Sequence, residues 1–177
     1  MSNTIVLADN PQRIAAVREL FLEYANSLDF DLCFQSFERE LAGLPGDYVF
    51  PGGTLLLALA DDHPAGCVAL HKLEEGICEM KRLYVRPQFR GTGLGSQLAR
   101  SVIESAVTMG YVRMRLDTVA SRMQDALRMY RRLGFVEIEA YRENPIPSAL
   151  YMELDLTKFV SSTLAGSDPR TLTASND

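Results

Sequence analysis

The sequence predicts an α/β fold of the α+β type, with one mixed central sheet of about six to seven strands flanked by helices. Two observations carry this prediction. Short apolar or alternating runs, typical of strands, are interspersed with longer stretches in which apolar residues recur every three or four positions, as in helices. In chain order these segments give β-α-α-β-β-β-α-β-α-β-β, and a length of 177 residues fits a single domain.

The first quarter of the chain is expected to hold one strand and two helices. Thr4–Leu7 is a short apolar run, and Asn10-Pro11 opens a helix because proline is favoured at an early helical position. The apolar face of that helix is formed by Ile14, Val17, Leu20, Phe21 and Tyr24. Ser36 is a candidate cap for the second helix, and residues 43–53 form a loop rich in glycine and proline.

The rest of the chain alternates strands with two further helices. The expected strands are Thr54–Leu59, Ala65–Leu73, Ile77–Val85, Arg113–Thr118, Phe135–Ala140 and Ala149–Leu156. The first three follow one another through short turns, so we expect them to pair antiparallel. One helix is expected from about Gly93 to Met109, and another contains Tyr130. The loop 141–147 is expected at the rim of a functional site.

Composition and charge limit the class of protein. The chain has 18 basic and 23 acidic residues, and no run approaches the roughly 20 apolar residues of a membrane span. It opens without a signal-peptide pattern. We therefore expect a cytoplasmic protein that binds neither nucleic acid nor membranes. The three cysteines have no metal-ligand spacing, so buried thiols and no metal site are predicted. Residues 1–160 are expected to form the domain, and 161–177 a flexible tail.

The segment Arg90-Gly91-Thr92-Gly93-Leu94-Gly95 is the strongest functional signal. It joins a predicted strand to a predicted helix, so backbone N–H groups and the positive end of the helix would face one point. Residues 80–103 contain five basic residues and no acid, although the whole chain is acidic. A phosphate ligand is therefore expected. The spacing matches neither a P-loop nor a Gly-x-Gly-x-x-Gly fingerprint, and a plain tight turn is the alternative.

A second motif downstream completes a family resemblance. Residues 126–135 read as a short helix with a glycine stop that leads into a strand. Together with Arg-x-x-Gly-x-Gly, this resembles the GNAT superfamily of acetyl-CoA-dependent N-acetyltransferases over roughly residues 4–156. The motif positions are met by Arg90, Gly93, Gly95, Ala126, Tyr130, Gly134 and Phe135. Met123 departs from the pattern, because asparagine is common at that position and often helps to hold the cofactor.

The resemblance implies a single GNAT-like domain whose strands splay apart at a cofactor cleft, with acetyl-CoA as the acetyl donor. In the family, free backbone groups of one strand pair with the pantetheine arm, and the glycine-rich loop donates N–H groups to the pyrophosphate. The cofactor-binding residues implied here are Leu83, Tyr84, Val85, Arg90, Gly91, Thr92, Gly93, Leu94, Gly95 and Ser96.

Two residues are candidates for the chemistry of acetyl transfer. The resemblance implies that Tyr130 protonates the leaving thiolate, and a phenol with a pKa near ~10 suits that task. The alternative is an aromatic residue of the core. Glu79 precedes Arg90 by eleven residues, an offset that resembles that of the catalytic glutamate in the histone-acetylating branch. The alternatives are a carboxylate paired with Lys81 or Arg82, and ordered water as the base.

The acceptor site implied by the resemblance lies between the first two helices and the loop before the last strand. Its candidate residues are Tyr24, Asp29, Asp31, Tyr141, Arg142 and Asn144, with Phe34 and Tyr48 beside them. Acids beside aromatic rings suit a cationic amine, such as a polyamine or a lysine-like amine. Solvated loop acids are the alternative.

Three classes of function compete at this point. The first is an enzyme that transfers acetyl to a primary amine of a small molecule or protein, as a monomer or homodimer. The second is an acetyl-CoA sensor of the same fold without turnover, and the third is a structural protein. The presence of Tyr130 favours the enzyme, and the basic glycine-rich segment has no explanation in a structural protein.

Overall fold

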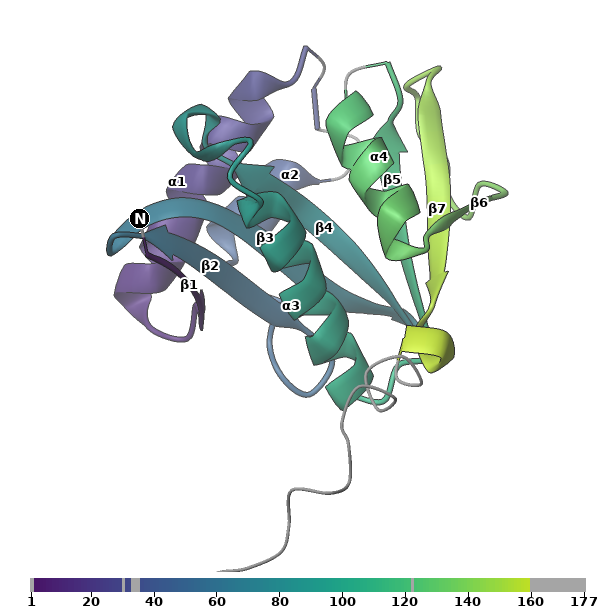
Figure 1. Ribbon diagram of the computed structural model, residues 1–177, viewed down its shortest axis with the longest axis horizontal. Helices are drawn as coiled ribbons and strands as arrows, with labels where there is room; N and C mark the ends of the chain where they lie inside the picture. Colours follow the sequence, from purple (N-terminus) through teal and green to yellow (C-terminus); the bar gives the residue numbers. More distant parts are fainter. Residues whose placement is uncertain (1, 30, 33–35, 122, 160–177) are drawn as a thin grey trace, which may run out of the picture.

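A computed structural model describes residues 2–29, 31–32, 36–121 and 123–159. Its centre is a seven-stranded sheet with the strand order β1-β2-β3-β4-β5-β7-β6 (Figure 1). The strands are β1 (Asn3–Leu7), β2 (Thr54–Ala60), β3 (His63–Glu74), β4 (Ile77–Val85), β5 (Arg113–Val119), β6 (Val136–Ile138) and β7 (Ala149–Asp155). The helices are α1 (Pro11–Ser27), α2 (Phe37–Ala42), the 3-10 turn η2 (Pro87–Phe89), α3 (Leu94–Thr108) and α4 (Gln124–Leu133).

The sheet is mixed, as the sequence predicts. β1 to β4 pair antiparallel in chain order, and β5, β7 and β6 form a second antiparallel set. The two sets meet where β4 runs parallel to β5. The connection between these parallel strands contains α3, as a crossover between parallel strands requires.

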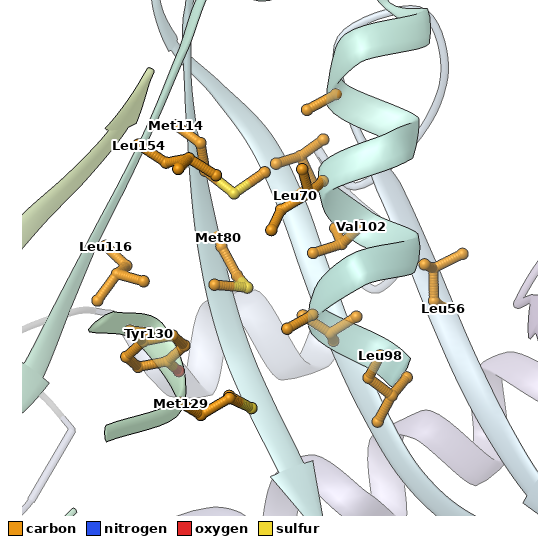
Figure 2. Close-up of a cluster of buried hydrophobic side chains, with 14 of the residues drawn as sticks. Leu56, Leu70, Met80, Leu98, Val102, Met114, Leu116, Met129, Tyr130 and Leu154 are labelled. Carbon is orange, nitrogen blue, oxygen red and sulfur yellow. The ribbon is translucent and has the colours of Figure 1, made fainter. Parts of the chain in front are cut away.

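The helices cover both faces of the sheet, and each face has its own core. α3 buries Leu98, Ala99 and Val102 against β2, β3 and β4 on one face, in a cluster that also includes Tyr130 of α4 (Figure 2). α1 buries Val17, Leu20 and Phe21 on the other face. Among the described residues, no helix is long and apolar enough to cross a membrane.

β4 and β5 separate along their length, and this separation creates the site. Only Ile77–Glu79 pair with Arg113–Arg115, at the start of both strands. Further along β4, the register against β3 shifts between Cys67 and Ala69, and Arg82 has a φ of 57°. An extra residue with such a φ is a β-bulge, which bends and twists its strand. The two strands therefore diverge toward their carboxyl ends (Figure 1).

Several boundaries differ from the sequence prediction. Ser36 precedes α2 but makes no side-chain capping bond, because its φ of 55° lies outside the extended region that capping residues adopt. β6 covers only Val136–Ile138, and β3 begins at His63. In contrast, Asn10 caps α1 by accepting a bond from the Arg13 amide at 3.0 Å, with Pro11 as the first helical residue. The predicted tail, 161–177, lies outside the described residues.

The packing of α3 on the sheet gives a test of the fold. Leu98→Ala removes a fully buried side chain of α3 and should lower the free energy of unfolding by about 2–5 kcal/mol, because a cavity remains between helix and sheet. Leu22→Ala is the matched control, since Leu22 is also helical but 43% exposed. The control should change the free energy by less than about 1 kcal/mol in urea unfolding. Equal losses of unfolding free energy in the two variants would mean that the packing of α3 on the sheet does not stabilise the fold.

Candidate functional site

A cleft of about 450 Å³ opens where β4 and β5 part. One wall is residues 80–85 of β4, and the other is residues 116–119 of β5. The end of α1, the inner side of α4 and the loop before β7 complete it, with Tyr24, Asp29, Tyr130 and Asn144 among the lining residues. Beyond Glu79, the side of β4 that faces β5 has no strand partner, so backbone polar groups of residues 83–85 are available to a ligand.

The bulge in β4 is held by an ion pair that the sequence analysis missed. The Arg82 guanidinium donates to both carboxylate oxygens of Glu40, at 3.1 and 2.7 Å, and lies 5.2 Å from the centre of the Phe37 ring. Tyr48 also donates to Glu40, at 2.6 Å. Burial alone would raise the pKa of Glu40, but the bonds and charge of Arg82 outweigh it and lower this pKa. Arg82 is therefore engaged with α2.

The glycine-rich loop forms a cradle of backbone at the mouth of the cleft. Gly91 and Gly93 have φ values of +78° and +84°, and a Cβ on either would meet nothing within 4 Å. Their conformation therefore requires glycine, and the space beside them is open. α3 begins at Leu94 without a side-chain cap, and the first amides of a helix have no intrahelical acceptor. Together these features favour an anion at this point.

Arg90 and Thr92 fix the loop in place. Arg90 Nε donates to the carbonyl of Val85 at 3.0 Å, and the guanidinium lies 5.8 Å from the centre of the Tyr84 ring. The hydroxyl of Thr92 donates to the carbonyl of Phe89 at 2.7 Å. These bonds join the loop to the end of β4, so the anion site and the free backbone of β4 form one continuous surface.

Tyr130 extends from the inner side of α4 into the region between Met80 and Leu116 (Figure 2). Its side chain is 7% exposed, lines the cleft and packs edge-on against Phe135 at 5.6 Å. Burial raises the pKa of Tyr130 above its usual value, so the phenol is protonated at neutral pH. The core contact and the position in the cleft are both present, and a role as an acid remains a prediction.

Met123 takes the place that the family pattern gives to asparagine. It precedes α4, makes no side-chain capping bond and lines the cleft. Its sulfur accepts a bond from the hydroxyl of Thr118 at 3.4 Å. The side chain is thus apolar toward the cleft, and it offers a ligand no amide.

Glu79 lies at the fork of the two strands, outside the lining of the cleft. Its side chain is fully buried and accepts hydrogen bonds from Tyr141 at 2.7 Å and Arg142 at 3.0 Å, with His71 at 3.0 Å. Burial alone would raise its pKa, but His71, the charge of Arg142 and Tyr141 outweigh it and lower the pKa to about 2. This geometry favours the alternative of a paired carboxylate. Its partners are not the expected Lys81 and Arg82.

Arg142 links the two strands at this fork. One guanidinium nitrogen donates to Glu79 of β4, and the other donates to Asp117 of β5 at 2.7 Å. Asn144 donates to the second oxygen of Asp117 at 3.1 Å. The loop before β7 is therefore tied to the sheet, and Tyr141 and Arg142 serve this attachment without lining the cleft.

The structure thus divides the predicted site residues into two groups. Those that line the cleft are Tyr24, Asp29, Leu83, Tyr84, Val85, Arg90, Tyr130 and Asn144. Glu79, Asp31, Tyr48, Tyr141, Arg142 and residues 91–96 do not line it, and Phe34 lies outside the described residues. Sequence analysis missed Lys81, which faces the cleft, and Asp117. The alternation of β5 could have indicated Asp117, because it shares a face with Arg113 and Arg115.

Metal-ligating side chains do not gather anywhere in the part of the chain that the structure describes. No group of three or more His, Cys, Asp or Glu residues there could hold an ion. Cys67 and Cys78 are buried free thiols, as expected, and burial raises the pKa of each.

Comparisons with known proteins agree with this geometry. Residues 14–135 match the model of the acetyltransferase (GNAT) family. An uncharacterized N-acetyltransferase of Schizosaccharomyces pombe is 41% identical over 151 residues, which span 84% of this chain and 91% of that protein. Human N-acetylaspartate synthetase is 34% identical over 98 residues, 55% of this chain and 32% of that protein. The acetyltransferase yncA of Salmonella typhimurium, solved with acetyl-CoA, has a TM-score of 0.69 at 19% identity, covering 88% of this chain and 95% of that one.

The low pKa of Glu79 predicts a pH-dependent stability. The carboxyl has an ordinary pKa of 4.5 and a pKa of about 2 in the folded protein. Its ionised form therefore stabilises the fold fully above about pH 5, and this contribution is lost as the pH falls from 4.5 to 2. The difference in unfolding free energy between wild type and Glu79→Gln should shrink over that range in urea titrations. Glu38→Gln, which alters an exposed glutamate, is the control. If the difference in unfolding free energy does not change with pH, the hydrogen-bond network around the ionised Glu79 is contradicted.

Proposed function

Because the chain belongs to the acetyltransferase (GNAT) family, we propose that the cleft between β4 and β5 is its active site, with the acetyl donor along β4 and an amine acceptor beneath α1. The protein is an acetyltransferase that uses acetyl-CoA. The observation that carries the assignment of the site is the parting of the strands. It leaves the backbone of residues 83–85 without a strand partner on the side that faces β5, beside a glycine cradle for phosphate.

Acetyl-CoA fits this surface from end to end. The pyrophosphate would accept bonds from amides of residues 91–96, where both φ values and open space suit a close approach. The pantetheine arm would pair with the backbone of Leu83 and Val85 in place of a strand. Arg90, at the junction, would add a positive charge beside the phosphates. An amide of β4 directed at the thioester oxygen would polarise the carbonyl.

The transfer can then proceed in one displacement. A neutral amine attacks the thioester carbon, a C–N bond forms, and the C–S bond breaks with its electron pair left on sulfur. Tyr130 would donate its phenolic proton to that thiolate and would recover a proton from solvent. Its raised pKa keeps the proton available at neutral pH.

Glu79 does not reach an amine in the cleft, because its carboxylate is enclosed by Tyr141, Arg142 and His71. We therefore propose that solvent in the cleft accepts the proton that the amine loses. This is the alternative to Glu79 that the sequence analysis left open. Glu79 would act indirectly, since it holds the loop that carries Asn144 against the sheet.

The acceptor would lie between the end of α1 and the loop before β7. Tyr24, Asp29 and Asn144 line this part of the cleft. One partly similar relative is named N-acetylaspartate synthetase, a name that describes an N-acetylated amino acid as its product. A free amino acid therefore joins the cationic amines as a candidate acceptor.

The cradle predicts a specific loss of donor binding. Gly93→Asp should weaken acetyl-CoA binding by at least about 100-fold, because the carboxylate opposes the phosphates and two charge-assisted hydrogen bonds of about 1.5 kcal/mol each are lost. Gly110→Asp is the matched control, since Gly110 has a φ of +87° in open space at the other end of α3. Calorimetry should find wild-type affinity in the control. Equal affinity in both folded variants would exclude the cradle as the phosphate site.

The role of Tyr130 predicts a loss of turnover without a loss of binding. Tyr130→Phe keeps the packing against Phe135 and should lower kcat by roughly 100-fold or more, the scale of a positioned acid. The affinity for acetyl-CoA should stay within about twofold. Tyr111→Phe removes a hydroxyl that donates to the carbonyl of Gly52, outside the cleft, and should leave kcat unchanged. Full activity in Tyr130→Phe would assign Tyr130 to the core alone.

A further inference from the structure

Lys81 is a half-buried cation that the proposed reaction does not use. It lies on β4 beside the bulge and lines the active-site cleft. It also lines a second cavity, of about 300 Å³, whose other walls are residues 36–48 and His71. Among the described residues, the Lys81 ammonium forms neither a hydrogen bond nor an ion pair.

The carboxylates nearest to Lys81 already have other cations as partners. Glu40 accepts hydrogen bonds from Nε and Nη2 of Arg82, and Glu79 is bonded to Arg142 and His71. Burial, followed by repulsion from Arg82, lowers the pKa of Lys81, and the more weakly acting charges of Glu40 and Glu79 do not offset this. Such a shift means that the surroundings destabilise its charge, and a bound anion would restore it.

The carboxylates across the cleft are engaged as well. Asp117 accepts bonds from Arg142 and Asn144, and Asp125 pairs with Arg128. Asp29 also has an interaction of its own. Arg90 lies at the phosphate end, where it contacts the Val85 carbonyl and the Tyr84 ring. On the acceptor side, Lys81 is therefore the cation of the cleft that has no direct hydrogen bond or ion pair to a carboxylate among the described residues.

We infer that Lys81 binds a carboxylate of the acceptor, so that the enzyme acetylates small amines that carry a carboxylate near the amino group. This inference rests on the proposed function, because it places the amine in the same cleft. The transferred acetyl group would lie beside residues 83–85, roughly 10 Å along the strand from Lys81. A flexible lysine side chain spans part of that distance, and an amino acid spans the rest. The inference replaces the expectation, drawn from Asp29 and Asp31, of a cationic acceptor.

Matched acceptors and matched variants test this inference together. Thiol release from acetyl-CoA is measured with L-alanine, L-alaninamide, L-aspartate, spermidine and a lysine-containing peptide, with rates expressed per unprotonated amine. Wild type should prefer L-alanine to L-alaninamide by at least about tenfold in kcat/KM. Lys81→Met should reduce that preference about tenfold, because it should raise the KM of L-alanine about tenfold more than the KM of L-alaninamide. Lys81→Arg should keep most of the preference. Lys72→Met, at an exposed lysine of β3, should have no effect.

The affinity for acetyl-CoA, measured by calorimetry, verifies that each variant is folded with an intact donor site. A carboxylate preference that survives in Lys81→Met would overturn the inference. An equal fall of kcat on L-alanine and L-alaninamide in Lys81→Met would overturn it too, because that pattern belongs to a proton acceptor. Faster turnover of spermidine or the peptide than of amino acids would refute it while the proposed function stands. Absence of both acetyl-CoA binding and thiol release would refute both.

Discussion

The ion pair between Arg82 and Glu40 is the interaction on which the site depends. A φ of 57° at a non-glycine residue costs on the order of 1–3 kcal/mol, so a strand adopts it only where the surroundings compensate. Here a bidentate bond to Glu40 and the face of Phe37 compensate, and both belong to α2. The bulge that follows turns β4 away from β5, which opens the cleft and leaves backbone beside the donor site unpaired.

A second interaction limits how far the strands part. Arg142 joins Glu79 on β4 to Asp117 on β5, at the place where strand pairing ends. Removing either carboxylate would leave a partly buried guanidinium without one of its partners, which is costly. The fork is thus fixed at one end by this bridge and held open at the other by the bulge. Both Tyr130 and the glycine cradle depend on that fixed spacing.

Local patterns predicted the order of elements, the start of α1 at Asn10-Pro11 and the glycine-rich turn, because each depends on residues within a few positions of one another. The partners of Glu79 could not be predicted in this way. Arg142 lies 63 residues away in sequence, and Glu40 lies 42 residues from Arg82. Charge proximity along the strand suggested Lys81 and Arg82 instead. The bulge contains no glycine, so the sequence gives no indication of the positive φ at Arg82.

The two ends of the cleft differ in how their specificity is encoded. The donor end uses backbone amides, and where the phosphates would bind, close approach of the backbone needs glycines that are visible in the sequence. The acceptor end uses side-chain charges, and their effect depends on which charges cancel in the folded chain. Asp117 and Glu79 count as acids in the sequence, but in the folded chain both carboxylates are paired with Arg142. An acceptor therefore meets the charged groups that have no direct partner, and only the folded structure shows that Lys81 is one of them.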